Sequence, residues 1–290
     1  MRAALSLLLL CAAALPPTAC DSGSTSNFDV PADATGDSAG DLPQASPETS
    51  FTPVDLVTAR EYQALLVEID HVSGHGPNAA ALSQLEQQLD ALRAAGHLAK
   101  PGGVRFVIDE VLTPVGADHV STFDELQALA QAHRSLVPAP GEAAIHVLYV
   151  DGHYQDDSEQ SQILGFAYGG SWLVMLADNI DGGCDSSPLL SLPGLSPARD
   201  QVCARAESTV FMHELGHLFG LVDNGAPMVT PHEDADHAHH DANEDCLMYW
   251  AIQGSKAIDL IAQRFKDNQQ GAVSFDAACL ADLDALIAGR

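Results

Sequence analysis

The sequence predicts an α+β fold in which helices pack on a mixed β-sheet. Three observations carry this prediction. Residues 58–220 alternate between segments with strand-like and helix-like apolar spacing. The order of these segments is strand, helix, strand, helix, strand, strand, helix, as expected for helices layered on a sheet. The chain has 290 residues, 46% of them hydrophobic, which is enough to bury a sizeable core.

Each element has its own local signal. Residues 144–152 are almost entirely apolar, which is typical of a central strand covered on both faces. Pro77 and Gly96 mark the ends of one helix, and Ser121 or Thr122 can cap another. The predicted strands are 58–72, 104–112, 144–152 and 165–179, the last broken at Gly169 and Gly170, and the predicted helices are 77–98, 121–136 and 204–220.

The rest of the folded part is expected to be smaller and mainly helical. Residues 181–200 and 221–245 read as loops, the first because it is rich in proline and glycine. Two closing helices are predicted over 255–268 and 275–289. We therefore predict one folded domain over 54–290, with an N-terminal subdomain at 54–220 and a C-terminal subdomain at 221–290.

The first 53 residues are expected to lie outside this fold. Residues 1–20 combine an early arginine, an apolar run and small residues before Cys20, as in a secretory signal peptide. The end of this segment resembles a bacterial lipoprotein leader with Cys20 as the lipidated residue, although Pro17 stands where leucine is usual. Plain secretion is the alternative, and an ordinary buried helix is the third interpretation. Residues 21–53 contain no lysine or arginine and predict a disordered acidic linker.

The net charge indicates which partners to exclude, and the cysteines indicate which cross-links to expect. The formal net charge is -28, so phosphate backbones and anionic headgroups would repel the chain. We expect no nucleic-acid partner, and membrane contact only through a lipid anchor. The four cysteines of the predicted folded domain, in an exported chain, predict two disulfides, with three possible connectivities and buried free thiols as the alternative. They are Cys184, Cys203, Cys246 and Cys279. None of them forms a CxxC pair, so we do not expect a zinc site with thiolate ligands.

The segment FMHELGHLFG, residues 211–220, holds the strongest functional signal. His213 and His217 are four residues apart, so on a helix they project from one face and can bind one zinc ion. Glu214 is rotated by roughly 100° from His213 and can take a proton from a metal-bound water without binding the metal. Gly220 falls where the chain must turn after the second histidine, since glycine tolerates positive φ.

At these residues the sequence resembles the metzincin clan of zinc peptidases. His213, Glu214, His217 and Gly220 match the clan's HExxHxxG, and Met248 in CLMYW resembles the methionine of its Met-turn. The resemblance implies a mixed sheet with two long helices, one catalytic zinc ion and peptide-bond hydrolysis. It also implies that Glu214 is the general base and that a protein or peptide is the substrate.

The sequence offers several candidates for the third zinc ligand. The clan usually has a histidine where this chain has Asp223, and an aspartate serves there in the snapalysin-like branch. In archaemetzincin-like sequences the third histidine and the methionine form the pattern HCxxxxCxM, which His240, Cys246 and Met248 match with Asp241 in place of the first cysteine. Imidazole suits zinc well, so His240 is preferred over Asp223, with His237 and His232 as further candidates.

The acidic loop residues, Glu233, Asp234, Asp236 and Asp241, could hold calcium, but EF-hand spacing is absent and a solvated loop is expected instead. The leading prediction is an exported zinc-dependent endopeptidase, anchored to the cell envelope through Cys20. The alternatives are a non-catalytic surface binding protein stabilised by zinc, and a metal-scavenging lipoprotein that uses the histidine-rich loop.

Overall fold

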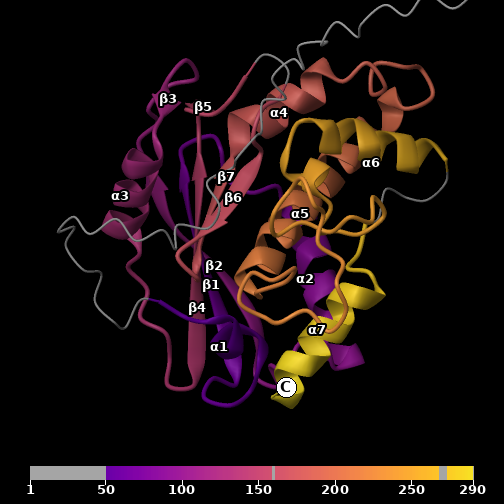
Figure 1. Cartoon of the computed structure of the whole chain (residues 1–290). Coiled ribbons are helices and arrows are strands. Elements are labelled where there is room, and N and C mark those ends of the chain that lie inside the picture. Colours follow the sequence, from indigo (N-terminus) through magenta and orange to yellow (C-terminus); the bar gives the residue numbers. More distant parts are fainter. Residues whose placement is uncertain (1–49, 159–160, 268–272, 290) are drawn as a thin grey trace, which may run out of the picture.

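A five-stranded mixed sheet forms the centre of the molecule (Figure 1). The computed structural model describes residues 50–158, 161–267 and 273–289. The strand order is β2-β1-β4-β7-β6, in which four strands are parallel and β6 runs antiparallel to β7. The strands are β1 (Ala64–Val72), β2 (Gly103–Leu112), β4 (Glu142–Val150), β6 (Gly165–Tyr168) and β7 (Trp172–Leu176). The predicted mixed sheet is confirmed.

Two long helices cover one face of this sheet, and a shorter helix covers the other (Figure 1). Helices α2 (Ala79–Ala95) and α5 (Arg199–Leu218) pack on each other, and Ser208 of α5 donates a hydrogen bond to Gln84 of α2 at 3.1 Å. Helix α3 (Phe123–His133) lies on the opposite face, where Leu126 and Ala130 are buried. Helices α6 (Lys256–Lys266) and α7 (Ala277–Ala288) complete the mainly helical C-terminal part that the sequence predicts.

The folded part begins earlier than the predicted boundary at residue 54. Phe51 is buried, and Thr52 and Asp55 form a reciprocal capping box for the short helix α1 (Pro53–Val57). The strand predicted from residue 58 begins only at Ala64, because the chain first passes around the buried ammonium group of Lys100. That group donates hydrogen bonds to the carbonyl oxygens of Asp55, Thr58 and Tyr62.

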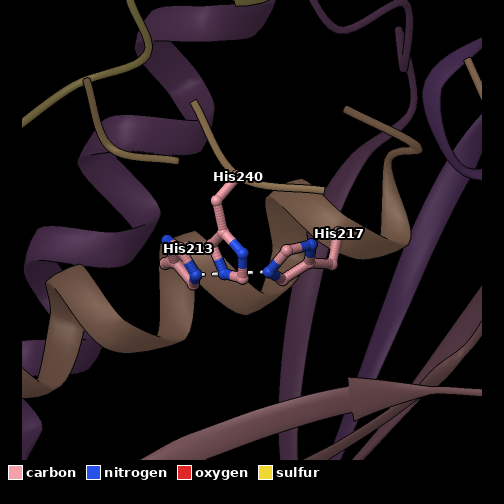
Figure 2. Close-up of side chains that lie close together, drawn as sticks. All are labelled: His213, His217 and His240. Carbon is pink, nitrogen blue, oxygen red and sulfur yellow. Dashed lines mark hydrogen bonds between the residues drawn. The ribbon is translucent and has the colours of Figure 1, made fainter. Parts of the chain in front are cut away.

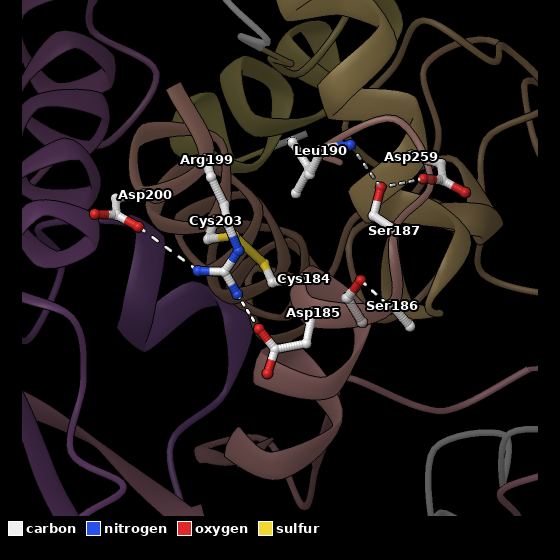
Figure 3. The surroundings of a disulfide bond; sticks show 10 residues. Cys184, Asp185, Ser186, Ser187, Leu190, Arg199, Asp200, Cys203 and Asp259 are labelled. Carbon is white, nitrogen blue, oxygen red and sulfur yellow. Dashed lines mark hydrogen bonds and ion pairs between the residues drawn. A yellow bond between two sulfur atoms is a disulfide. The ribbon is translucent and has the colours of Figure 1, made fainter. Parts of the chain in front are cut away.

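The single strand predicted at 165–179 is a hairpin followed by a helix. Gly169 and Gly170 have φ of 57° and 76°, so they turn the chain between β6 and β7. Helix α4 (Ala177–Ser186) then occupies the first part of the region predicted as a loop. A disulfide between Cys184 and Cys203 joins α4 to α5 (Figure 3). This bond links the helix that carries the histidine motif to the helix that follows β7.

The prediction of two disulfides is wrong for the described structure, which contains one. Cys246 and Cys279 are buried free thiols whose Sγ atoms lie 3.7 Å apart, a non-bonded contact. Asp241 lies beside them with 1% of its surface exposed, so it is not part of a solvated acidic loop as predicted. Its backbone N–H donates to the Met248 carbonyl at 2.8 Å, which fixes the loop against the CLMYW segment.

The predicted signal peptide at 1–20, the lipidation site Cys20 and residues 21–49 of the predicted linker lie outside the described residues. In the part of the chain that the structure describes, no helix combines the length and the apolar character needed to cross a membrane.

Candidate metal centre

Helix α5 positions the first two histidines of the site. It runs for 20 residues, and its second half is buried on nearly every side because it lies between the sheet and the C-terminal part. His213 is completely buried, and His217 is half-buried one turn later, near the end of the helix. Gly220 follows with φ of 83°, and a Cβ there would meet the Ala226 backbone nitrogen at 2.7 Å. The helix must therefore stop and turn at this glycine, as the sequence predicts.

Three imidazole rings converge at this point, as Figure 2 shows. His240 comes from the loop after α5 and brings its ring to the pair on the helix, with one ring nitrogen from each histidine within 4.8 Å of the others. The Nε2 atoms of His213 and His217 are 3.2 Å apart. His240 is 7% exposed, so the three rings form a largely buried cluster on one side of α5.

Backbone carbonyl oxygens orient two of the rings. A carbonyl can only accept, so Nδ1 of His213 donates to the Leu247 oxygen at 2.6 Å, and Nδ1 of His240 donates to the Ala238 oxygen at 2.9 Å. Both bonds leave Nε2 free of its proton and turned toward the cluster centre. This is the tautomer that metal-binding histidines adopt, with the second ring nitrogen held by a hydrogen bond.

Burial keeps the three rings neutral. Desolvation lowers the pKa of His213 to about 3 and that of His240 to about 4. Desolvation also lowers the pKa of His217 well below its usual value, and the neighbouring rings of His213 and His240 add to this effect. Neutral imidazoles with free Nε2 lone pairs are the form that binds divalent cations.

Glu214 lies beside the cluster and faces the same cleft. It is 1% exposed, and burial raises the pKa of its carboxyl group to about 8, while a hydrogen bond from the Ala167 backbone on β6 opposes this shift. Its Oε1 atom is buried without a hydrogen-bond partner. Burying a carboxylate oxygen without a partner is unfavourable, and a proton or a cation close to it would reduce this cost.

The other predicted third ligands lie elsewhere. Asp223 is exposed, with φ of 59°, and lines the cleft outside the three-histidine cluster. His237 stacks on Trp250 with ring centroids 4.4 Å apart. His232 contacts Cys279 and Asp282 beside helix α7. Of the candidates, the structure therefore brings only His240 to His213 and His217.

Met248 lies beneath the cluster, fully buried against α5. A Cβ at Gly216 would be 2.3 Å from its Sδ atom, so the close approach requires a glycine between the two helix histidines. Met248 was predicted from the sequence as part of the site, whereas Gly216 was not. The signal that could have found it is the unusual glycine in the interior of a helix, where this residue is costly without a packing reason.

A cleft of about 560 Å³ opens onto His217 and His240, while His213 is buried behind them. Glu214, His217 and His240 form part of its wall, together with residues of the edge strand β6 and the turn that follows it. The cleft is also lined by residues 50–53, which were predicted to belong to the linker. Gln253, which was not predicted as a site residue, completes this wall. None of the described residues that line it is a lysine or arginine.

No protein-family model matches the chain, and no curated protein matches its sequence. Among solved structures it is similar to an archaemetzincin from Methanopyrus kandleri, with 14% identity and a TM-score of 0.44 over 78% of this chain and 97% of that one. It is also similar to a zinc-dependent peptidase from Methanocorpusculum labreanum, with 14% identity and a TM-score of 0.41 over 75% and 99% of the two chains. Both likenesses are distant, so the chemistry proposed for this chain rests on its own side chains.

Proposed function

We propose that this protein is a zinc-dependent endopeptidase in which His213, His217 and His240 hold the ion and Glu214 is the general base. One observation carries the proposal. Three neutral imidazoles converge beside a buried carboxylate, and two of them, His217 and His240, line a cleft together with Glu214. Three protein ligands with one open position are typical of a catalytic rather than a structural zinc site.

The side chains fit a divalent zinc ion in number and in chemistry. Three nitrogen donors converge within 4.8 Å, and carbonyl hydrogen bonds orient two of the rings. The unpartnered Oε1 atom of Glu214 is also accounted for, because a charged group nearby offsets the cost of burying it. When bound, zinc lowers the pKa of a coordinated water to about 7 and polarises a carbonyl group.

Residues of the chain itself transfer the proton and bind the peptide. Burial makes the Glu214 carboxylate a stronger base than an exposed one, and a cation bound beside it would favour the ionised form that a general base requires. The Ala167 backbone holds this carboxylate toward the cleft. Glu214 accepts a proton and then carries it to the leaving amine. The strand β6 lies at the edge of the sheet and lines the cleft, so an extended peptide could bind there as an added strand.

The test is zinc-loaded Glu214→Gln assayed on casein and on fluorogenic peptides. We expect zinc content to stay at that of the parent while kcat falls by about 10²–10⁴-fold, the usual loss of a general base. Asp223→Asn is the matched control, because it removes an acidic group from the same cleft. Equal cleavage by parent and Glu214→Gln would refute the proposal, and several weakly bound zinc ions in the parent would favour a metal-scavenging protein.

We propose in addition that the protein is exported and anchored through a lipid on Cys20. The proposal rests on the leader-like sequence of residues 1–20. The full chain should partition into the detergent phase, and Cys20→Ser should abolish this partition. An unmodified mature N-terminus, or cleavage at another residue, would mean ordinary secretion.

A further inference from the structure

The side chain of Gln253 reaches into the cluster of three histidines. Its Oε1 atom lies 3.2 Å from Nε2 of His240, and the same side chain lies beside the ring of His213. Gln253 ends the short 3₁₀-helix η3 (Trp250–Gln253) and is half-buried at the cleft wall. The amide group therefore contacts two of the three rings that we propose as ligands.

These contacts bring the amide oxygen close to ring nitrogens that carry no proton. Amide oxygen and ring nitrogen can form a hydrogen bond only if the ring nitrogen carries a proton. The Nδ1 atoms of His213 and His240 already donate to backbone carbonyls, so a neutral ring has no proton on Nε2. The amide oxygen of Gln253 therefore faces the lone pairs of the Nε2 atoms, which repel it. With an ion bound, this close contact is favourable only if the oxygen also coordinates the ion.

The spacing of the atoms fits such sharing. Zinc binds nitrogen and oxygen ligands at about 2.0–2.2 Å, so neighbouring ligand atoms of a tetrahedral site lie about 3.3 Å apart. The His213–His217 pair and the His240–Gln253 pair are each separated by 3.2 Å. Reversing the amide would turn its NH₂ group toward the cation, which is unfavourable.

We propose that Oε1 of Gln253 is the fourth ligand of the resting metal centre and closes the position that catalysis requires to be open. It must leave before a water or a substrate carbonyl can take this position. The backbone of Gln253 is held in place, because its carbonyl oxygen accepts from Leu164 at 2.8 Å, next to β6. Release is therefore a rotation of the side chain into the cleft that it lines.

The inference rests on the proposed function only in requiring that the three histidines bind zinc. It is tested by measuring two affinities of the full chain: that for zinc, by competition with a chelator, and that of the zinc-loaded protein for acetohydroxamate. Gln253→Ala should bind zinc about tenfold to a hundredfold more weakly, as for the loss of a supporting group at a metal site. It should bind acetohydroxamate at least about tenfold more tightly, because no closed form has to be opened first.

The opposite directions of these two changes identify a displaceable ligand, since general damage to the site would weaken both affinities. Gln253→Glu should reverse them, because a carboxylate binds the ion more strongly than an amide and is harder to displace. Gln263→Ala on α6 is the matched control, a half-buried glutamine outside the cleft, and should change neither affinity.

Unchanged zinc affinity in Gln253→Ala, or weaker binding of acetohydroxamate together with weaker binding of zinc, would overturn the inference. A parent protein that binds no zinc would instead refute the proposed function. Zinc binding with the expected behaviour of Gln253, but without peptide cleavage, would support the fourth ligand and contradict the peptidase.

Discussion

His213 donates a hydrogen bond from Nδ1 to the carbonyl oxygen of Leu247 at 2.6 Å, which joins helix α5 to the segment that contains Met248. The residues are 34 positions apart in the sequence. The bond selects the ring tautomer with Nε2 free and holds this nitrogen toward His217 and His240. The C-terminal part of the chain thus orients a ligand on the long helix, and the site depends on the contact between the two parts.

The third ligand can be tested by substitution. We expect His240→Ala to lower zinc affinity by orders of magnitude, because the structure brings its ring to the other two histidines. Asp223→Ala should bind zinc nearly as the parent does, since this exposed carboxylate lies outside the cluster. Chelator competition measures both, and His237→Ala serves as a control from the same loop. If Asp223→Ala lost zinc while His240→Ala kept it, the assignment would be reversed.

Gly216 should not tolerate a larger side chain. A methyl group there would lie 2.3 Å from Sδ of Met248, so we expect Gly216→Ala to destabilise the fold by about 1–3 kcal/mol, the usual cost of overpacking. Gly182→Ala in α4 is the control, because a Cβ at that position has no heavy atom within 4 Å. It should be neutral or slightly stabilising. Denaturant unfolding measures both, and equal stability of the two variants would contradict the packing argument.

The pH dependence of stability should contain a contribution from Glu207. Burial raises the pKa of its carboxyl group to about 7, partly offset by hydrogen bonds from the Asn78 backbone and the Tyr149 hydroxyl. The ordinary value is 4.5, so the folded state prefers the protonated form. The stabilisation is complete below pH 4.5 and is lost as the pH rises toward 7, by at most about 1.4 kcal/mol per pH unit.

Glu207→Gln carries a permanently neutral group and should remove this contribution. The unfolding free energy of the parent should therefore fall, relative to that of the variant, between pH 4.5 and 7. The exposed Glu86 on α2 supplies the control substitution, Glu86→Gln, which should follow the parent. Parallel curves for parent and Glu207→Gln would show that this carboxyl group is not protonated by folding.

The disulfide between Cys184 and Cys203 should contribute to stability. It closes a loop with a sequence separation of 19, for which restriction of the unfolded chain is worth about 3 kcal/mol. The double variant Cys184→Ala/Cys203→Ala should unfold correspondingly earlier under non-reducing conditions. Its difference from the parent should vanish when the parent is reduced. A difference that survives reduction would come from lost packing rather than from the bond.

Local sequence patterns determined much of the fold and half of the candidate site. Apolar periodicity placed the strands predicted at 104–112 and 144–152 and the helix predicted at 77–98 to within a few residues, because burial of one face imposes that periodicity. The strand predicted from residue 58 begins six residues later, at Ala64. The i, i+4 spacing of His213 and His217 needs only a helix to bring both rings to one side. The local pattern did not reveal the role of Gly169 and Gly170. These two glycines form the turn of a hairpin where the sequence predicted an interrupted strand.

Only the tertiary structure decided which distant groups join those two histidines. His240, Gln253 and Met248 reach the site through loops and a 3₁₀-helix, whose course depends on packing against α5 and β6 rather than on local pattern. Cys246 and Cys279 likewise meet as thiols, although an even number of cysteines predicted a bond. A sequence determines local conformation through neighbouring residues, whereas contacts between distant residues are decided by the packing of the whole core.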